Sequence, residues 1–130
     1  MKIPYSRQDL NQDDIDAVSQ VLKSDYLTQG PLVPKFENAV ISHTGAKFGI
    51  AVNSATSALH LACLALKVMP NDYVWTSPIT FVASANCALY CRANVDFVDI
   101  DPISYNMSVS ALKKKLELAK KNNTLPKVVI

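Results

Sequence analysis

Residues 73–100, YVWTSPITFVASANCALYCRANVDFVDI, contain the stretch that decides the fold. Residues 73–76 and 95–100 are short apolar runs rich in residues that favour strands. Between them, a polar turn leads into residues 81–90, an apolar segment long enough for a helix. A strand, a helix and a second strand in this order predict two parallel strands joined by a helical crossover.

The flanking sequence repeats this pattern. We expect a strand over residues 48–52, a buried helix over 55–66 and a further strand that begins at Val128. Ser108 can cap another helix, with Val109, Leu112, Leu116 and Ala119 on one face. The order predicts an α/β fold, with a mostly parallel sheet and flanking helices. The chain is still apolar at Ile130, so we expect either a fragment of a longer domain or a partner that completes the sheet.

The N-terminal third has a different character. Asn11 can cap a helix whose first turn carries two acidic residues and whose apolar positions Ile15, Val18 and Leu22 recur at helical spacing. Residues 25–34 contain one glycine and two prolines and predict a loop, and residues 36–44 predict a short helix. We therefore divide the chain into an arm with a helix and a loop, residues 1–34, and the first part of a larger domain, residues 35–130.

Composition excludes several classes of protein. The 130 residues are 49% apolar and 18% charged, which is globular, and a net charge of +2 gives no reason to expect nucleic acid or a membrane surface as partner. No apolar run reaches the roughly 18 residues of a membrane span. The first residues, MKIPY at 1–5, lack the apolar stretch of a secretory signal. Five lysines on the last helix predict a solvated face: Lys113, Lys114, Lys115, Lys120 and Lys121.

The cysteines and other possible ligands do not predict a metal site. Cys63, Cys87 and Cys91 lie in apolar segments, and we expect buried free thiols, as in a reducing cytoplasm. Asp99 and Asp101 fit a turn at a strand end better than a metal site. Neither GxGxxG nor a Walker motif occurs.

Two strand-to-helix turns carry the candidate chemistry. The first, NSATSAL at residues 53–59, would expose the free N–H groups of a helix N-terminus, which suit a phosphate. Ala55 is small enough to let an anion approach, and Thr56 and Ser57 could donate from their hydroxyls. The alternative is an ordinary cap, with Ser54 or Thr56 starting a core helix.

The second turn lies within residues 76–86, TSPITFVASAN. Ligands of open α/β sheets bind beyond the carboxyl ends of the strands, and both turns lie at such ends. Phe81 could present its ring face to a planar ligand there. The alternative is that Phe81 is a core aromatic.

Together these segments resemble the DegT/DnrJ/EryC1/StrS family of sugar-nucleotide aminotransferases, in the aspartate-aminotransferase-like (type I) fold of pyridoxal-phosphate (PLP) enzymes. The resemblance covers almost the whole chain. It is carried by YLTQGP at 26–31 with FE at 36–37, by the two turns above and by VDFVDID at 95–101. The middle blocks, with YNMS at 105–108 after them, are most similar in sequence to the branch of the family that works in pseudaminic acid biosynthesis.

The resemblance implies a function and a site. It implies transfer of an amino group from glutamate to C4 of a UDP-linked 4-keto-6-deoxy-N-acetylhexosamine, in a cytoplasmic homodimer. By this resemblance, the turn of Ala55, Thr56 and Ser57 holds the phosphate of PLP and Phe81 stacks on its ring. The residues implied at the sugar nucleotide are Tyr5, Asp25, Tyr26, Leu27, Thr28 and Ala55.

Other parts of the family pattern are absent or altered. The lysine that carries PLP as a Schiff base, and the family's Asp and Ser partners of the cofactor, would follow later in the chain, so we expect no catalytic residue in these 130. Residues 69–72 and 92–94 stand where the family usually has glycine. Two alternatives stay open: a dehydratase or regulator of the same fold, in which a dehydratase has His in place of that lysine, and a non-catalytic module for a phosphorylated ligand.

Overall fold

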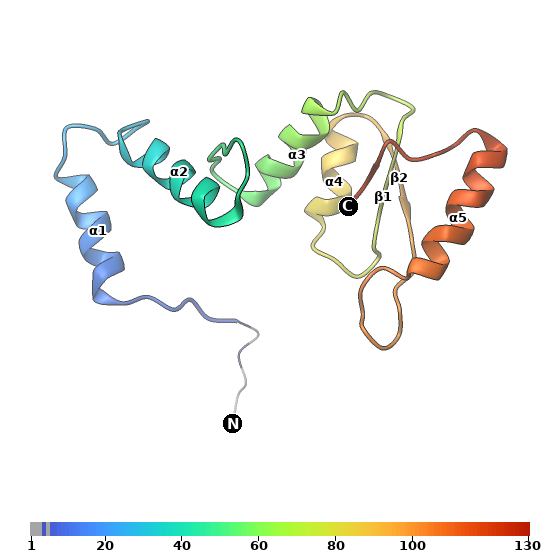
Figure 1. Cartoon of the computed structure of the whole chain (residues 1–130), viewed down its shortest axis with the longest axis horizontal. Helices are drawn as coiled ribbons and strands as arrows, with labels where there is room; N and C mark the ends of the chain where they lie inside the picture. Colours follow the sequence, from blue (N-terminus) through green and yellow to red (C-terminus); the bar gives the residue numbers. More distant parts are fainter. Residues whose placement is uncertain (1–3, 5) are drawn as a thin grey trace. The chain divides into compact units, whose positions relative to one another are not determined.

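The computed structural model describes Pro4 and residues 6–130, which form two compact units, Met1–Ala51 and Val52–Ile130. Figure 1 shows the order of their elements along the chain. The division that we predicted after residue 34 remains a prediction, and the helix that follows it groups with the N-terminal unit.

The N-terminal unit contains two helices. Helix α1, Gln12–Leu22, begins at the predicted cap: the Asn11 side chain accepts hydrogen bonds from the N–H groups of Asp13 and Asp14, and the Asp14 carboxylate accepts from the Asn11 N–H. Helix α2, Leu32–Thr44, begins four residues earlier than predicted, because prolines fit at a helix start, where no N–H is needed. It ends at Gly45, whose φ of 71° favours glycine.

The predicted strand at residues 48–52 is wrong. This segment has no ladder to a neighbouring strand, and Phe48 and Ile50 are 77% and 82% exposed. Its backbone instead contacts a side chain of α2, because the Ala51 N–H donates to Glu37 Oε1 at 2.8 Å. A strand needs a partner for its backbone, and the described residues offer none to this segment.

The C-terminal unit is built on three parallel strands in the order β2-β1-β3. Strand β1, Tyr73–Thr76, pairs along its length with β2, Asn94–Phe97, and on its other side with β3, Val128–Val129. Helix α3, Ala55–Ala65, precedes the sheet, α4, Ala83–Tyr90, connects β1 to β2, and α5, Val109–Asn122, connects β2 to β3. The predicted parallel sheet with flanking helices is confirmed.

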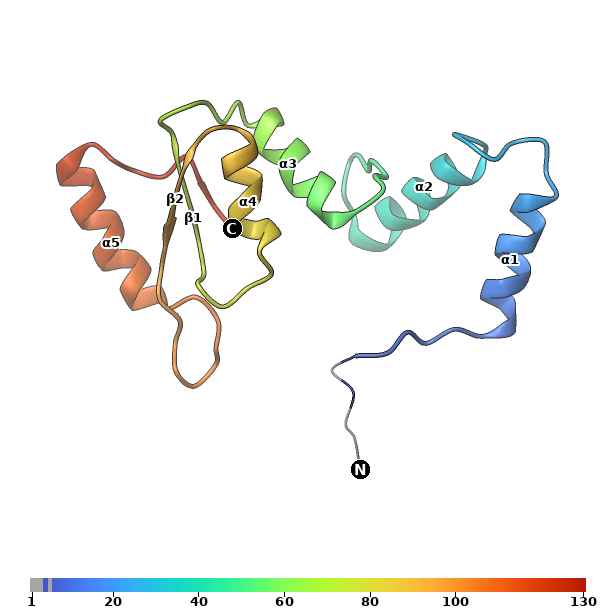
Figure 2. The same ribbon diagram turned by 180° about the vertical axis from the view of Figure 1, so that it is seen from behind.

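Helices cover both faces of this sheet. Figures 1 and 2 show α3 and α4 on one face and α5 on the other. Alternation along β1 supplies both cores: Val74 packs toward α4, whereas Tyr73 and Trp75 pack toward α5. The chain moves from β1 to β2 in one direction and returns past β1 to β3, and right-handed crossovers in opposite directions put their helices on opposite faces.

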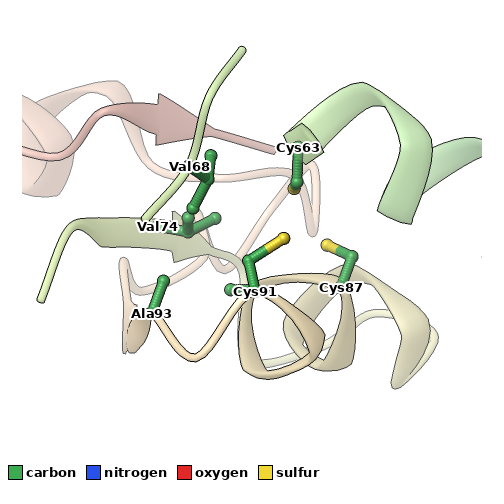
Figure 3. Packing of buried hydrophobic residues seen from close by; sticks show 7 residues of the cluster. Cys63, Val68, Val74, Cys87, Cys91 and Ala93 are labelled. Atoms are coloured by element: carbon green, nitrogen blue, oxygen red, sulfur yellow. The ribbon is translucent and has the colours of Figure 1, made fainter. Parts of the chain in front are cut away.

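The core on the α3 and α4 face is made of small side chains. Cys63, Cys87 and Cys91 are free, buried thiols, as predicted, and Figure 3 shows them where the two helices meet. Burial, together with the neighbouring thiols, raises the pKa of Cys63 to about 12. Cys63 is therefore a protonated packing residue rather than a nucleophile.

Candidate functional site

The carboxyl edge of the parallel sheet is where the site begins. The strands are parallel, so all three end at this edge. Thr76, the last residue of β1, is buried, and its carbonyl accepts a hydrogen bond from the Val98 N–H at 2.9 Å. The turn that follows β1 leads over residues 77–82 into α4 and carries Phe81.

Phe81 lies outside the core that the described residues form. Its side chain is 73% exposed. The alternative of a core aromatic is therefore wrong for this unit of the chain. The apolar sequence around Phe81 favoured a buried ring. In the structure the ring is exposed beside a polar turn, where a planar ligand could contact it.

The first turn begins α3 through the cap that the sequence predicted. Ser54 is the N-cap, with extended backbone angles, and its Oγ accepts from the Ser57 N–H at 3.1 Å. The Ser57 hydroxyl in turn donates to Asn53 Oδ1 at 2.7 Å. The cap and the predicted anion site are thus parts of one turn, and the cap engages only one of the free N–H groups.

Two backbone donors stay available at this turn. Within residue 4 and residues 6–130, no hydrogen bond engages the N–H of Ala55 or of Thr56, the first two residues of α3. Ala55 is exposed, and its methyl group leaves the amides uncovered. Free N–H groups at the positive end of a helix dipole attract an anion, and a phosphate above all.

The two turns belong to the same unit. Helices α3 and α4 pack against each other through Cys63, Cys87 and Ala88, and His60 meets the Tyr90 ring edge to face at 5.2 Å. Figure 1 shows both helices beginning toward the end of the sheet at which β1 and β2 stop. The arrangement combines a helix start that has free N–H groups with an exposed aromatic ring in one α/β unit.

The loop of the N-terminal unit forms a separate hollow of about 410 Å³. Tyr26 and Leu27 line it, whereas Asp25 and Thr28 do not, and Tyr5 lies outside the described residues. The loop is held by Ser24, whose hydroxyl donates to the Val21 carbonyl at 2.8 Å.

Gly30 allows the loop backbone to approach Tyr26 closely. A Cβ at this position would lie 2.8 Å from Tyr26 Cβ, so a larger residue would displace Tyr26. Several polar residues that our sequence reasoning missed also line the hollow, and no spacing in the sequence links them because they come from α1, the loop and α2: Gln20, Ser24, Gln29 and Lys35.

The carboxylates near the sheet have structural partners. Asp101 Oδ1 accepts from the N–H groups of Ile103 and Ser104 at 3.1 and 2.8 Å, and these bonds lower the pKa of Asp101. This geometry confirms the predicted turn. The part of the chain that the structure describes contains no group of metal-ligating side chains and no helix long and apolar enough to cross a membrane.

These features define an α/β protein with a helix start that has free N–H groups and an exposed aromatic ring in the turn after β1. Comparison with known proteins identifies the family within this fold class. The profile of the DegT/DnrJ/EryC1/StrS aminotransferase family matches residues 8–125, and the chain belongs to this family.

Three relatives illustrate the match. The UDP-4-amino-4,6-dideoxy-N-acetyl-beta-L-altrosamine transaminase of Campylobacter jejuni is 48% identical over 98 residues, which are 75% of this chain and 26% of that protein. The structure of PseC from Helicobacter pylori, an aminotransferase of pseudoaminic acid biosynthesis, matches with a TM-score of 0.81 and 32% identity over 99% of this chain and 33% of that one. Spr1654 from Streptococcus pneumoniae, solved in its PLP form, matches with a TM-score of 0.81 and 30% identity over 88% of this chain and 29% of that one.

These matches confirm the predicted family, the fold and the PLP dependence of the family. The chain spans about a quarter to a third of the length of the relatives it matches. The matched region includes both turns.

Proposed function

We propose that this chain is the N-terminal part of a PLP-dependent aminotransferase that moves an amino group from glutamate to C4 of a UDP-linked 4-keto-6-deoxy-N-acetylhexosamine. The observation that carries the proposal is the 48% identity to the UDP-4-amino-4,6-dideoxy-N-acetyl-beta-L-altrosamine transaminase of C. jejuni. The likeness to PseC over 99% of the chain supports the same branch of the family.

The residues present fit the proposed cofactor. The free N–H groups of Ala55 and Thr56, with the Thr56 hydroxyl, would hold the phosphate, since the helix dipole favours its charge. The exposed ring of Phe81 would cover one face of the pyridine ring. When bound, PLP supplies the carbonyl that receives the amino group from the donor and passes it to the keto sugar.

The residues of this chain contribute binding and orientation to that reaction. Fixing the phosphate and one ring face leaves the cofactor little freedom to rotate, which places its reactive carbon. We assign Tyr5 and the loop of Asp25, Tyr26, Leu27 and Thr28 to the sugar nucleotide, with Tyr26 and Leu27 lining the hollow of the N-terminal unit. A cytoplasmic homodimer belongs to the same proposal.

The experiment uses the full-length protein that contains these residues. The purified protein is incubated with PLP, glutamate and the UDP-linked 4-keto sugar, and the product is analysed by mass spectrometry and NMR. A 4-amino sugar formed with one equivalent of 2-oxoglutarate supports the proposal. Loss of a hydroxyl group from the sugar without net amination would make the protein a dehydratase, and absence of any reaction in a PLP-loaded protein would overturn the activity.

A further inference from the structure

Three polar side chains form one hydrogen-bonded chain at the start of α3. The Ser54 hydroxyl donates to Ser57 Oγ at 3.1 Å, and the Ser57 hydroxyl donates to Asn53 Oδ1 at 2.7 Å. The Ser57 N–H closes the turn by donating to Ser54 Oγ at 3.1 Å. The bond to Asn53 has the length of a well-formed O–H···O hydrogen bond.

This arrangement uses up the Ser57 hydroxyl. A hydroxyl has a single proton to donate, and that of Ser57 lies on Asn53. Its oxygen accepts from Ser54. A phosphate dianion only accepts hydrogen bonds, so Ser57 has no proton to offer it while the bond to Asn53 exists. The backbone N–H groups of Ala55 and Thr56, by contrast, stay free.

We propose that Asn53 and Ser57 are positioning residues for the cofactor phosphate, acting through the turn rather than by contact with the phosphate. This inference rests on the proposed function. Asn53 holds Ser57, and Ser57 with Ser54 fixes the first turn of α3 so that the amides of Ala55 and Thr56 point away from the helix together. Pre-set donors bind an anion more tightly than donors that must first be ordered.

The neutral amide of Asn53 matters as much as its shape. An aspartate at this position could accept the same bond from Ser57. It would also place a negative charge beside the phosphate site, which would repel the phosphate and offset the positive potential of the helix N-terminus there. Asn53 therefore supplies an acceptor for Ser57 without repelling the ligand.

The test measures PLP affinity of the full-length apoprotein by absorbance, with inorganic phosphate as a competitor that reports on the turn alone. Loss of one neutral hydrogen bond corresponds to about 1 kcal/mol, or about fivefold in Kd. We expect Asn53→Ala and Ser57→Ala each to weaken PLP and phosphate by about this factor. The double variant should be no weaker than either single one, because both remove the same bond.

Two further variants and one control separate positioning from general damage. Ser57→Thr keeps the hydroxyl and should retain affinity, whereas Asn53→Asp should bind PLP more weakly than Asn53→Ala, by a margin that shrinks with added salt. Ser110→Ala removes a serine of the same kind from the first turn of α5, where its hydroxyl pairs with that of Ser108 at 3.1 Å. It should leave PLP affinity unchanged.

Independent losses in Asn53→Ala and Ser57→Ala that add in the double variant would overturn the inference, as would unchanged affinity in both. Thermal melting of each apoprotein is measured alongside, and Ser57→Thr decides the question if an alanine variant fails to fold. Ala55→Glu in the same series tests the site itself. If Ala55→Glu loses PLP while the Asn53 and Ser57 variants keep it, the positioning inference fails and the proposed site stands.

Discussion

The exposure of the Phe81 side chain depends on the turn in which this residue lies. In sequence it is an apolar residue at the start of an apolar helix, and in the structure it lies 73% exposed in the turn before α4. Periodicity could not predict this exposure. Phe81 lies in the turn before α4, so its side chain does not follow the pattern of the buried face of that helix. The position of Phe81 after a strand end suggested a planar ligand, and the resemblance to the family named that ligand as the PLP ring.

We expect Phe81→Ala in the full-length protein to weaken PLP binding several-fold, since stacking on an aromatic ring contributes on the order of 1 kcal/mol. The melting temperature of the apoprotein should change little, because the ring is exposed in this unit. Absorbance titration with PLP measures the first effect. Phe81→Tyr, which keeps a ring, is the matched control, and equal PLP affinity in the alanine variant would remove Phe81 from the site.

The contacts of Asp72 predict how the stability of the fold depends on pH. Its Oδ2 accepts from the Met69 N–H at 2.8 Å and pairs with Lys127 Nζ at 3.0 Å, and these contacts lower the pKa of Asp72 below its ordinary value of 3.8. A lowered pKa in the folded state means that the ionised carboxylate stabilises the fold above about pH 4, and that this contribution disappears as the pH falls through the folded-state pKa.

Asp72→Asn should therefore be less stable than the parent near pH 7, and this difference in unfolding free energy should narrow as the pH is lowered below about 4. Urea unfolding of the apoprotein across this range measures it. Lys114→Met, which removes a lysine that forms no ion pair within the described residues, should show no such trend. A gap that is constant with pH would mean that Asp72 acts through packing or the turn alone.

At the scale of elements, local signals predicted well and long-range pairing did not. The caps at Asn11 and Ser108 and the strand Tyr73–Thr76 were predicted from neighbouring residues and are confirmed. The strand at residues 48–52 was not, because a strand also needs a partner from elsewhere in the chain. No repeating pattern in the sequence predicts the hydrogen bond from Ser57 to Asn53, and only the structure shows it.

The close packing of α4 on the sheet gives a prediction for this element. Ala88 lies on α4 and is fully buried in the core of small residues. Ala88→Leu adds volume that this interface cannot accept, and overpacking of this kind costs about 1–3 kcal/mol. Urea unfolding of the full-length apoprotein should show the loss. Ala65→Leu, at an exposed position of α3, is the control, and equal stability of the two variants would contradict the close packing.

At the scale of the whole molecule, we assign residues of this chain to binding, and we assign none of them to proton transfer. The family resemblance places the lysine that captures PLP outside the matched motifs of this chain. We therefore expect residues 1–130 alone to form no amino sugar from PLP, glutamate and the UDP-linked 4-keto sugar. Product formation above the uncatalysed rate, measured by mass spectrometry, would show that the chain contains a reactive group that we have not assigned.

The central claim is that the turn at the start of α3 receives the cofactor phosphate. Ala55→Glu in the full-length protein tests it most directly, because the substitution covers the free amides of Ala55 and Thr56 and adds a charge of the same sign as the phosphate. An acid at a helix start is tolerated by the helix dipole, so the apoprotein should melt close to the parent. Ala62→Glu, at an exposed position later in the same helix, is the control.

The measurement is PLP titration by absorbance, with melting of the apoprotein in parallel. The account predicts a loss of PLP affinity of at least about a hundredfold for Ala55→Glu, much larger than for Phe81→Ala, and parental affinity for Ala62→Glu. Parental PLP binding by a folded Ala55→Glu protein, or unfolding of that variant alone, would show that the turn is only a helix cap and would contradict the account.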